Sequence, residues 1–62
     1  MTLECDHGYM LEQLGSNLNY SLYYADQLLK MYLRVGDRER EAKILLLLAR
    51  VKQANELLKE LS

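Results

Sequence analysis

Apolar residues recur along the first half of the chain at steps of three and four. Between positions 9 and 33 these residues are Leu11, Leu14, Leu18, Leu22, Ala25, Leu29 and Tyr32. Because an α-helix completes a turn every 3.6 residues, this spacing places all of them on one helical face. The pattern predicts an amphipathic helix over about residues 8–34.

The second half of the chain repeats its apolar residues in heptads. The repeating residues are Ile44, Leu47, Val51, Ala54, Leu58 and Leu61. Their alternating steps of three and four are typical of a helix that packs against another helix along one seam. We predict this second helix over about residues 38–61.

Residues 35–37 separate the two patterns and have the chemistry of a turn. Gly36 supplies the left-handed backbone conformation that ends many helices, and Asp37 is a favoured N-cap. Glu39 and Glu41 then lie in the positive first turn of the second helix. Two helices joined so closely must lie antiparallel, so the sequence predicts an all-α fold in which residues 1–62 form one antiparallel helical hairpin.

The start of the first helix has two interpretations. Ser16, between Gly15 and Asn17, could be the N-cap of a helix that opens there. Alternatively, the same glycine could be a weak point in a longer helix that begins after Asp6. We expect the longer helix.

The chain carries more apolar residues than one seam needs. Six follow one another from Ile44 to Ala49, and about 100° per residue turns several of them away from the first helix. A tyrosine-rich stripe flanks the seam of the first helix at the same level, and tyrosine and methionine are enriched at protein interfaces. We expect these residues to form one surface that a partner chain covers, rather than to thicken the core of the hairpin. The predicted interface consists of Tyr20, Tyr24, Leu28, Met31, Ala42, Leu45, Leu46 and Ala49.

Composition supports a helical chain that needs a partner. The sequence has fifteen Leu, no Pro and only four β-branched residues, which favours helix over sheet. A chain of 62 residues buries only about 60% of the surface that its unfolded form exposes, so its folding alone is marginal. Cys5 is the only cysteine, which excludes an internal disulfide. The remaining way to stabilise the chain is association.

Charge and hydropathy argue against nucleic acid and membrane as partners. The formal net charge is −1, and the longest apolar run has six residues, far fewer than the roughly 18–20 that span a bilayer. Residues 1–6 have neither the basic region nor the apolar region of a signal peptide. Arg34, Arg38 and Arg40 cluster at the turn, but acidic residues alternate with them, which favours helix-end charge over a phosphate or RNA contact. We expect a soluble, cytoplasmic protein.

Catalytic chemistry has little support. Cys5, Asp6 and His7 are of metal-binding types, but a zinc site needs three or four converging ligands, and the chain has no second Cys or His. A nucleophilic Cys5 with His7 as base would lie at a helix end without a pocket. We therefore expect no enzyme activity, no cofactor and no metal.

The layout resembles the small helical-hairpin co-chaperones of bacterial type III secretion needle subunits, the YscE/PscE type. The resembling residues are Met1-Thr2-Leu3-Glu4 at the start and Met31-Tyr32-Leu33-Arg34-Val35-Gly36-Asp37 at the turn. The resemblance implies a non-enzymatic protein of the bacterial cytoplasm. It would pair with a larger, tetratricopeptide-like chaperone and with it keep the needle subunit monomeric. Two alternatives are a homodimeric four-helix bundle, as in small RNA-binding regulators, and a small inhibitor or adaptor of another protein.

Overall fold

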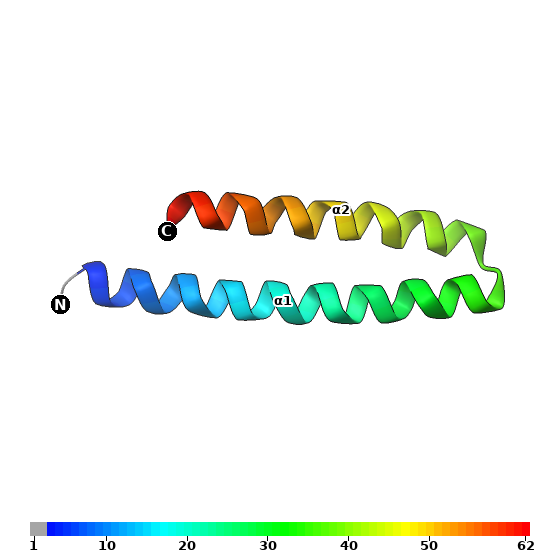
Figure 1. Cartoon of the computed structure of the whole chain (residues 1–62), viewed down its shortest axis with the longest axis horizontal. Coiled ribbons are helices and arrows are strands. Elements are labelled where there is room, and N and C mark those ends of the chain that lie inside the picture. Colours follow the sequence, from blue (N-terminus) through cyan, green and yellow to red (C-terminus); the bar gives the residue numbers. More distant parts are fainter. Residues whose placement is uncertain (1–2) are drawn as a thin grey trace.

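The computed structural model describes residues 3–62, with the side chains of residues 6–62, and forms a helical hairpin (Figure 1). Helix α1 spans Leu3–Val35 and helix α2 spans Arg38–Leu61. The described residues contain no strand, so the predicted all-α hairpin is confirmed. Because α1 has 33 residues and α2 has 24, the N-terminal end of α1 extends beyond the C-terminal end of its neighbour.

Helix α1 is longer than predicted. It begins at Leu3 instead of near residue 8, and it continues without interruption through Gly15 and Ser16. The chain contains no proline, and a glycine inside a helix costs only about 1 kcal/mol relative to alanine. The continuous helix was the expected interpretation, and the alternative start at Ser16 is wrong.

The turn is built as predicted. Gly36 has a φ of 75°, in the left-handed region. Its N–H donates to the Leu33 carbonyl at 3.3 Å, and the Asp37 N–H donates to the Tyr32 carbonyl at 3.0 Å, the hydrogen-bond pair of a Schellman motif. The Asp37 side chain then accepts a hydrogen bond from the Arg40 N–H at 3.1 Å. Asp37 therefore closes α1 through its N–H and caps α2 through its side chain.

The two helices meet along a regular seam. On α1 the buried and half-buried positions that repeat at steps of three and four are Leu11, Gly15, Leu18, Leu22, Ala25, Leu29 and Tyr32, and Asp6 and Asp26 are half-buried as well. On α2 the corresponding series is Asp37, Glu41, Ile44, Leu48, Val51, Asn55 and Leu58, with Ala54 beside it. A Cβ placed on Gly15 would lie 3.6 Å from Leu58 Cδ2, so the last turns of α2 pack against this part of α1.

Three predicted seam residues lie outside this seam. Leu14 and Leu47 are each 50% exposed, and Leu61 is 62% exposed. Gly15 and Leu48 take the places expected of the first two. Because an α-helix has 3.6 residues per turn, two adjacent positions are nearly equally suited to each contact with the other helix. Of Leu14 and Gly15, the sequence pattern favoured Leu14 because leucine is the larger apolar residue. In the structure Gly15 takes the seam position, and a Cβ there would still lie at an ordinary van der Waals distance from Leu58.

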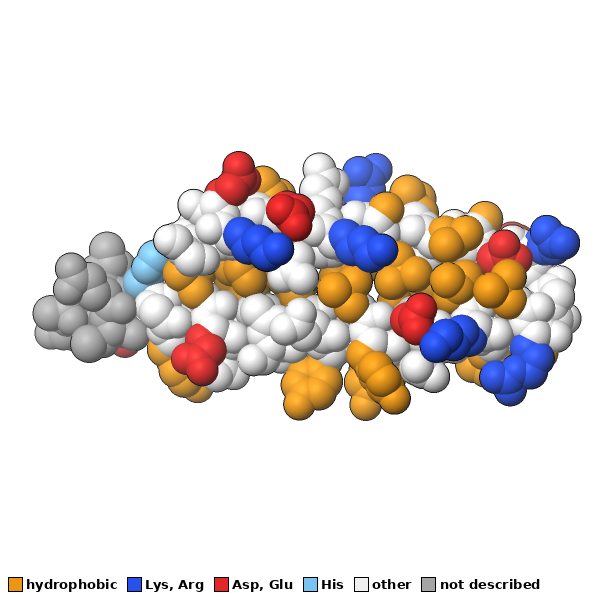
Figure 2. Space-filling view, in the orientation of Figure 1, with side chains coloured by type: hydrophobic (Ala, Val, Ile, Leu, Met, Phe, Trp, Pro, Cys, Tyr) orange, Lys and Arg blue, Asp and Glu red, His pale blue; other side chains and the backbone are white. Residues whose placement is uncertain are grey.

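The core of the hairpin is thin. Among the described residues only Ala25 and Ile44 are buried hydrophobic side chains, at 5% and 6% exposure. Fifteen large hydrophobic side chains remain exposed. The molecule measures 52 × 15 × 12 Å, so it has no third layer to cover them. Figure 2 shows one face, where hydrophobic side chains follow the boundary between the helices and charged side chains flank it.

Candidate protein-binding surfaces

All eight residues of the predicted interface are exposed. The six large ones range from 36% exposure at Leu28 to 66% at Tyr20, and Ala42 and Ala49 are exposed as well. The structure does not bring the eight residues together on one surface. It divides them between the outer face of α1, the outer face of α2 and the two sides of the hairpin.

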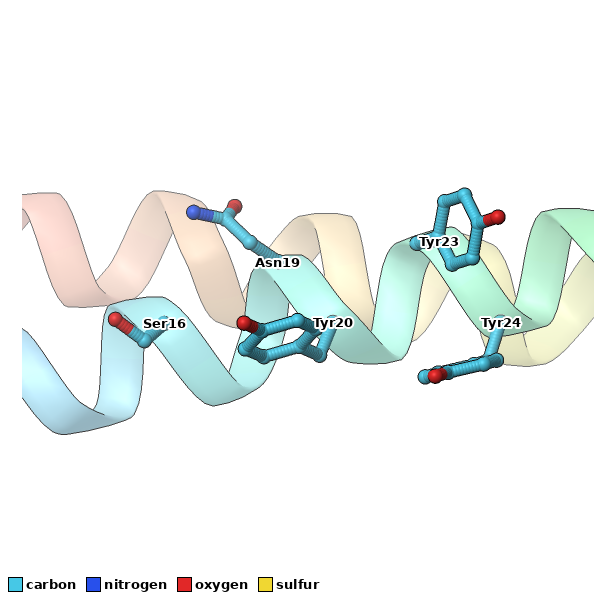
Figure 3. A pocket seen from close by; sticks show the side chains of 5 residues that line it. All are labelled: Ser16, Asn19, Tyr20, Tyr23 and Tyr24. Carbon is cyan, nitrogen blue, oxygen red and sulfur yellow. The ribbon is translucent and has the colours of Figure 1, made fainter.

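A tyrosine-lined hollow lies on α1 alone (Figure 3). Its lining residues are Ser16, Asn19, Tyr20, Tyr23 and Tyr24. In Figure 3 helix α2 lies behind α1, so the hollow is on the side of α1 that faces away from α2. The rings of Tyr23 and Tyr24 meet edge to face, with centroids 5.2 Å apart and planes at 80°. Such aromatic surfaces with hydroxyl groups at their edges are suited to protein contacts.

A groove between the two helices contains two further predicted residues. Its lining residues are Leu22, Asp26 and Leu29 of α1 with Leu45, Leu48, Ala49 and Lys52 of α2. Leu45, Ala49 and Lys52 each directly follow a seam residue of α2, and Asp26 directly follows Ala25 of α1. Residues that follow the seam on the two helices therefore share one side of the hairpin. We call this side the following side.

The opposite side carries residues that directly precede the seam. There a hollow is lined by Tyr32, Arg40, Lys43, Ile44 and Leu47. Arg40, Lys43 and Leu47 precede Glu41, Ile44 and Leu48 in the sequence. We call this side the preceding side. By the same helical geometry, Tyr24 and Leu28 of α1 belong to it, because they precede Ala25 and Leu29.

The residues that α2 contributes to the preceding side were not among the predicted interface residues. The heptad pattern predicted Leu47 in the seam, and the charge of Arg40 was interpreted only as complementing the helix end. Once Gly15 and Leu48 are recognised as seam residues, the heptad positions one residue earlier identify this side from the sequence. Leu46 lies two residues after Ile44, about 200° around the helix, and so points away from α1.

Ion pairs contribute little to these surfaces. Asp26–Lys30, Asp37–Arg40, Glu39–Lys43 and Glu56–Lys59 each join residues three or four apart on one helix, at 3.2–3.6 Å. None of them links α1 to α2. Exposed pairs of this kind stabilise a helix by about 0.3–0.5 kcal/mol each. Burial of apolar surface therefore dominates the association energy that these faces can provide.

The N-terminal residues form no ligand cluster in the described part of the chain. His7 is exposed, and the side chain of Cys5 lies outside the described residues. Among the residues described, no three His, Cys, Asp or Glu side chains converge as a metal site would require. In the same residues neither helix has a stretch that combines the length and apolarity of a membrane span.

No family model, curated protein or solved structure matches this chain.

Proposed function

We propose that the chain is a non-enzymatic, protein-binding hairpin whose core is completed by a partner chain. The observation that carries this proposal is the contrast between two buried hydrophobic side chains and fifteen large exposed ones among the described residues. Apolar surface on this scale drives association in water, because burying a leucine side chain contributes about 1.5–3 kcal/mol.

The dimensions of the chain support the same proposal. Its accessible surface is 5229 Å², whereas a compact monomer of 7.3 kDa has about 4,200 Å². Its radius of gyration is 15.1 Å, compared with about 11 Å for a compact domain of 62 residues. A hairpin that docks on a further layer of helices would bury the excess surface.

We propose more specifically that this partner is a tetratricopeptide-like chaperone of a bacterial type III secretion system. The two proteins would hold the needle subunit monomeric in the cytoplasm before export. The support is the resemblance in layout, a turn at Gly36 and Asp37 between two amphipathic helices, together with apolar faces suited to a helical partner. Binding energy from this complex would then stabilise a hairpin that is marginal alone.

The competing candidate is a homodimer that closes a four-helix bundle. The apolar side chains on both helices favour it, because two hairpins could cover each other. The mass of the purified chain in solution separates the two candidates. A discrete dimer with good solubility would support the bundle. A poorly soluble chain that becomes soluble when coexpressed with the chaperone would support the co-chaperone.

Substitutions at two exposed positions test the proposed partner contact. Tyr24→Glu and Leu46→Glu each place a charge where a partner would exclude water, while the seam stays intact. We expect both variants to lose copurification with the tetratricopeptide-like chaperone and to reduce accumulation of the needle subunit. Gln53→Glu, on the outer face of α2, is the control and should copurify normally.

The copurification results of the two variants show which face of the hairpin the partner contacts. Tyr24 lies on the preceding side and Leu46 on the outer face of α2, so loss at one position alone would confine the partner to that face. Wild-type copurification of both variants, with circular dichroism unchanged, would contradict the proposed contact.

A further inference from the structure

The exposed hydrophobic side chains are concentrated on the preceding side. Seven of the fifteen large exposed ones directly precede a position of the heptad seam. On α1 these are Met10, Leu14, Tyr24, Leu28 and Met31, and on α2 they are Leu47 and Leu57. Only three, Tyr23, Leu33 and Leu45, directly follow a seam position. The preceding side of the hairpin therefore carries more of the large exposed apolar side chains than the following side does.

The charges on this side have one sign. The positions that precede the α2 seam include Arg40, Lys43 and Arg50, and none of the preceding positions from Met10 to Leu57 is acidic. The following side differs, since Asp26, Lys52 and Glu56 place both signs there.

Arg40, Lys43 and Arg50 make only weak contacts with neighbouring polar groups. Arg40 lies 3.6 Å from Asp37, Lys43 lies 3.3 Å from Glu39, and Arg50 donates a hydrogen bond to Gln53 at 3.5 Å. These contacts lie within one helix and are exposed. The cations are thus free to exchange such contacts for carboxylates of a partner.

We infer that the preceding side binds an amphipathic helix of a partner protein, with its apolar stripe against α1 and a row of carboxylates along α2. A second copy of this chain fits poorly, because its own preceding side would add three more cations and no carboxylate. The heptad spacing of the exposed residues matches the spacing of a helix laid along the hairpin. This inference rests on the proposal that the chain binds a protein, and it specifies the chemistry of the partner.

Two synthetic peptides test the inference with the intact chain. Both are 24 residues long with leucine at the same heptad positions, and they carry either Glu or Lys at the positions that flank the leucines. We expect the Glu peptide to bind at least about tenfold more tightly in fluorescence anisotropy, with a preference that decreases as salt is raised. Equal binding of the two peptides, or binding of neither, would overturn the inference.

Matched substitutions locate the site. Arg50→Glu, on the preceding side, should reduce the preference for the Glu peptide at least fivefold, whereas Lys52→Glu, on the following side, should leave it unchanged. Leu47→Asn should weaken both peptides, because it removes apolar contact without changing charge. An equal effect of Arg50→Glu and Lys52→Glu would overturn the assignment to this side. Circular dichroism of each variant checks that the hairpin remains folded.

Failure of the inference can be distinguished from failure of the proposed function. If the tetratricopeptide-like chaperone copurifies equally with wild type, Leu47→Asn and Arg50→Glu, the proposed function stands and the preceding side is not the contact. If the Glu peptide binds as expected but no such chaperone copurifies, the inference stands and the secretion role is wrong. A homodimer that Arg50→Glu strengthens would assign the side to a second copy and overturn the inference.

Discussion

At the scale of single residues, the reversal of the chain depends on Gly36 and Asp37. Gly36 has a φ of 75°, so Gly36→Val should lower the free energy of unfolding by about 1 kcal/mol or more, while Gly36→Asn should cost less. Asp37→Ala removes the hydrogen bond to the Arg40 N–H and should cost about 1 kcal/mol. Urea titrations followed by circular dichroism measure both changes, and neutral results for Gly36→Val and Asp37→Ala would contradict this account of the turn.

At the scale of the helix, Gly15 is a seam position of α1 that carries a residue of low helix propensity. A Cβ at this position would meet only Leu58 Cδ2, at 3.6 Å, which is an ordinary van der Waals distance. Gly15→Ala should therefore raise the free energy of unfolding by about 0.5–1 kcal/mol, because alanine favours helix. The measurement is the midpoint of thermal unfolding.

Gly8 offers a control for this prediction. A Cβ at Gly8 would meet nothing within 4 Å, and the residue lies near the N-terminal end of α1. Gly8→Ala reports helix propensity without packing and should stabilise less, because helix ends fray. A fall in stability for Gly15→Ala would show that the helices approach more closely at this point than the 3.6 Å contact indicates.

At the scale of the whole molecule, the hairpin has a narrow core and wide uncovered sides. Ile44 is 6% exposed and Leu46 is 58% exposed. In the free chain Ile44→Ala should therefore cost about 2 kcal/mol or more, and Leu46→Ala should change stability by no more than about 0.5 kcal/mol. Urea titration at low protein concentration measures both values. Equal losses would mean that Leu46 is already covered, for example by a second copy.

The helices and the turn follow from local features of the sequence. The absence of proline, the abundance of leucine and the periodic apolar residues predicted two helices, and α2 has the predicted bounds of 38–61. Gly36 and Asp37 identified the reversal because helix termination and capping depend on one or two local residues. Local chemistry is sufficient for such features, since each acts within a single turn of the backbone.

The packing of α1 against α2 decides which apolar residues face α2 and which side each exposed residue occupies. Leu14 or Gly15, and Leu47 or Leu48, satisfy the helical period nearly equally, and the choice depends on how the two helices pack against each other. That choice rotates every neighbouring side chain by about 100° relative to the partner helix. It thereby separates Tyr20, Leu45 and Leu46, which the sequence had suggested would lie on one surface. The preceding and following sides are defined relative to the seam between the two helices, so they exist only once the helices have packed together.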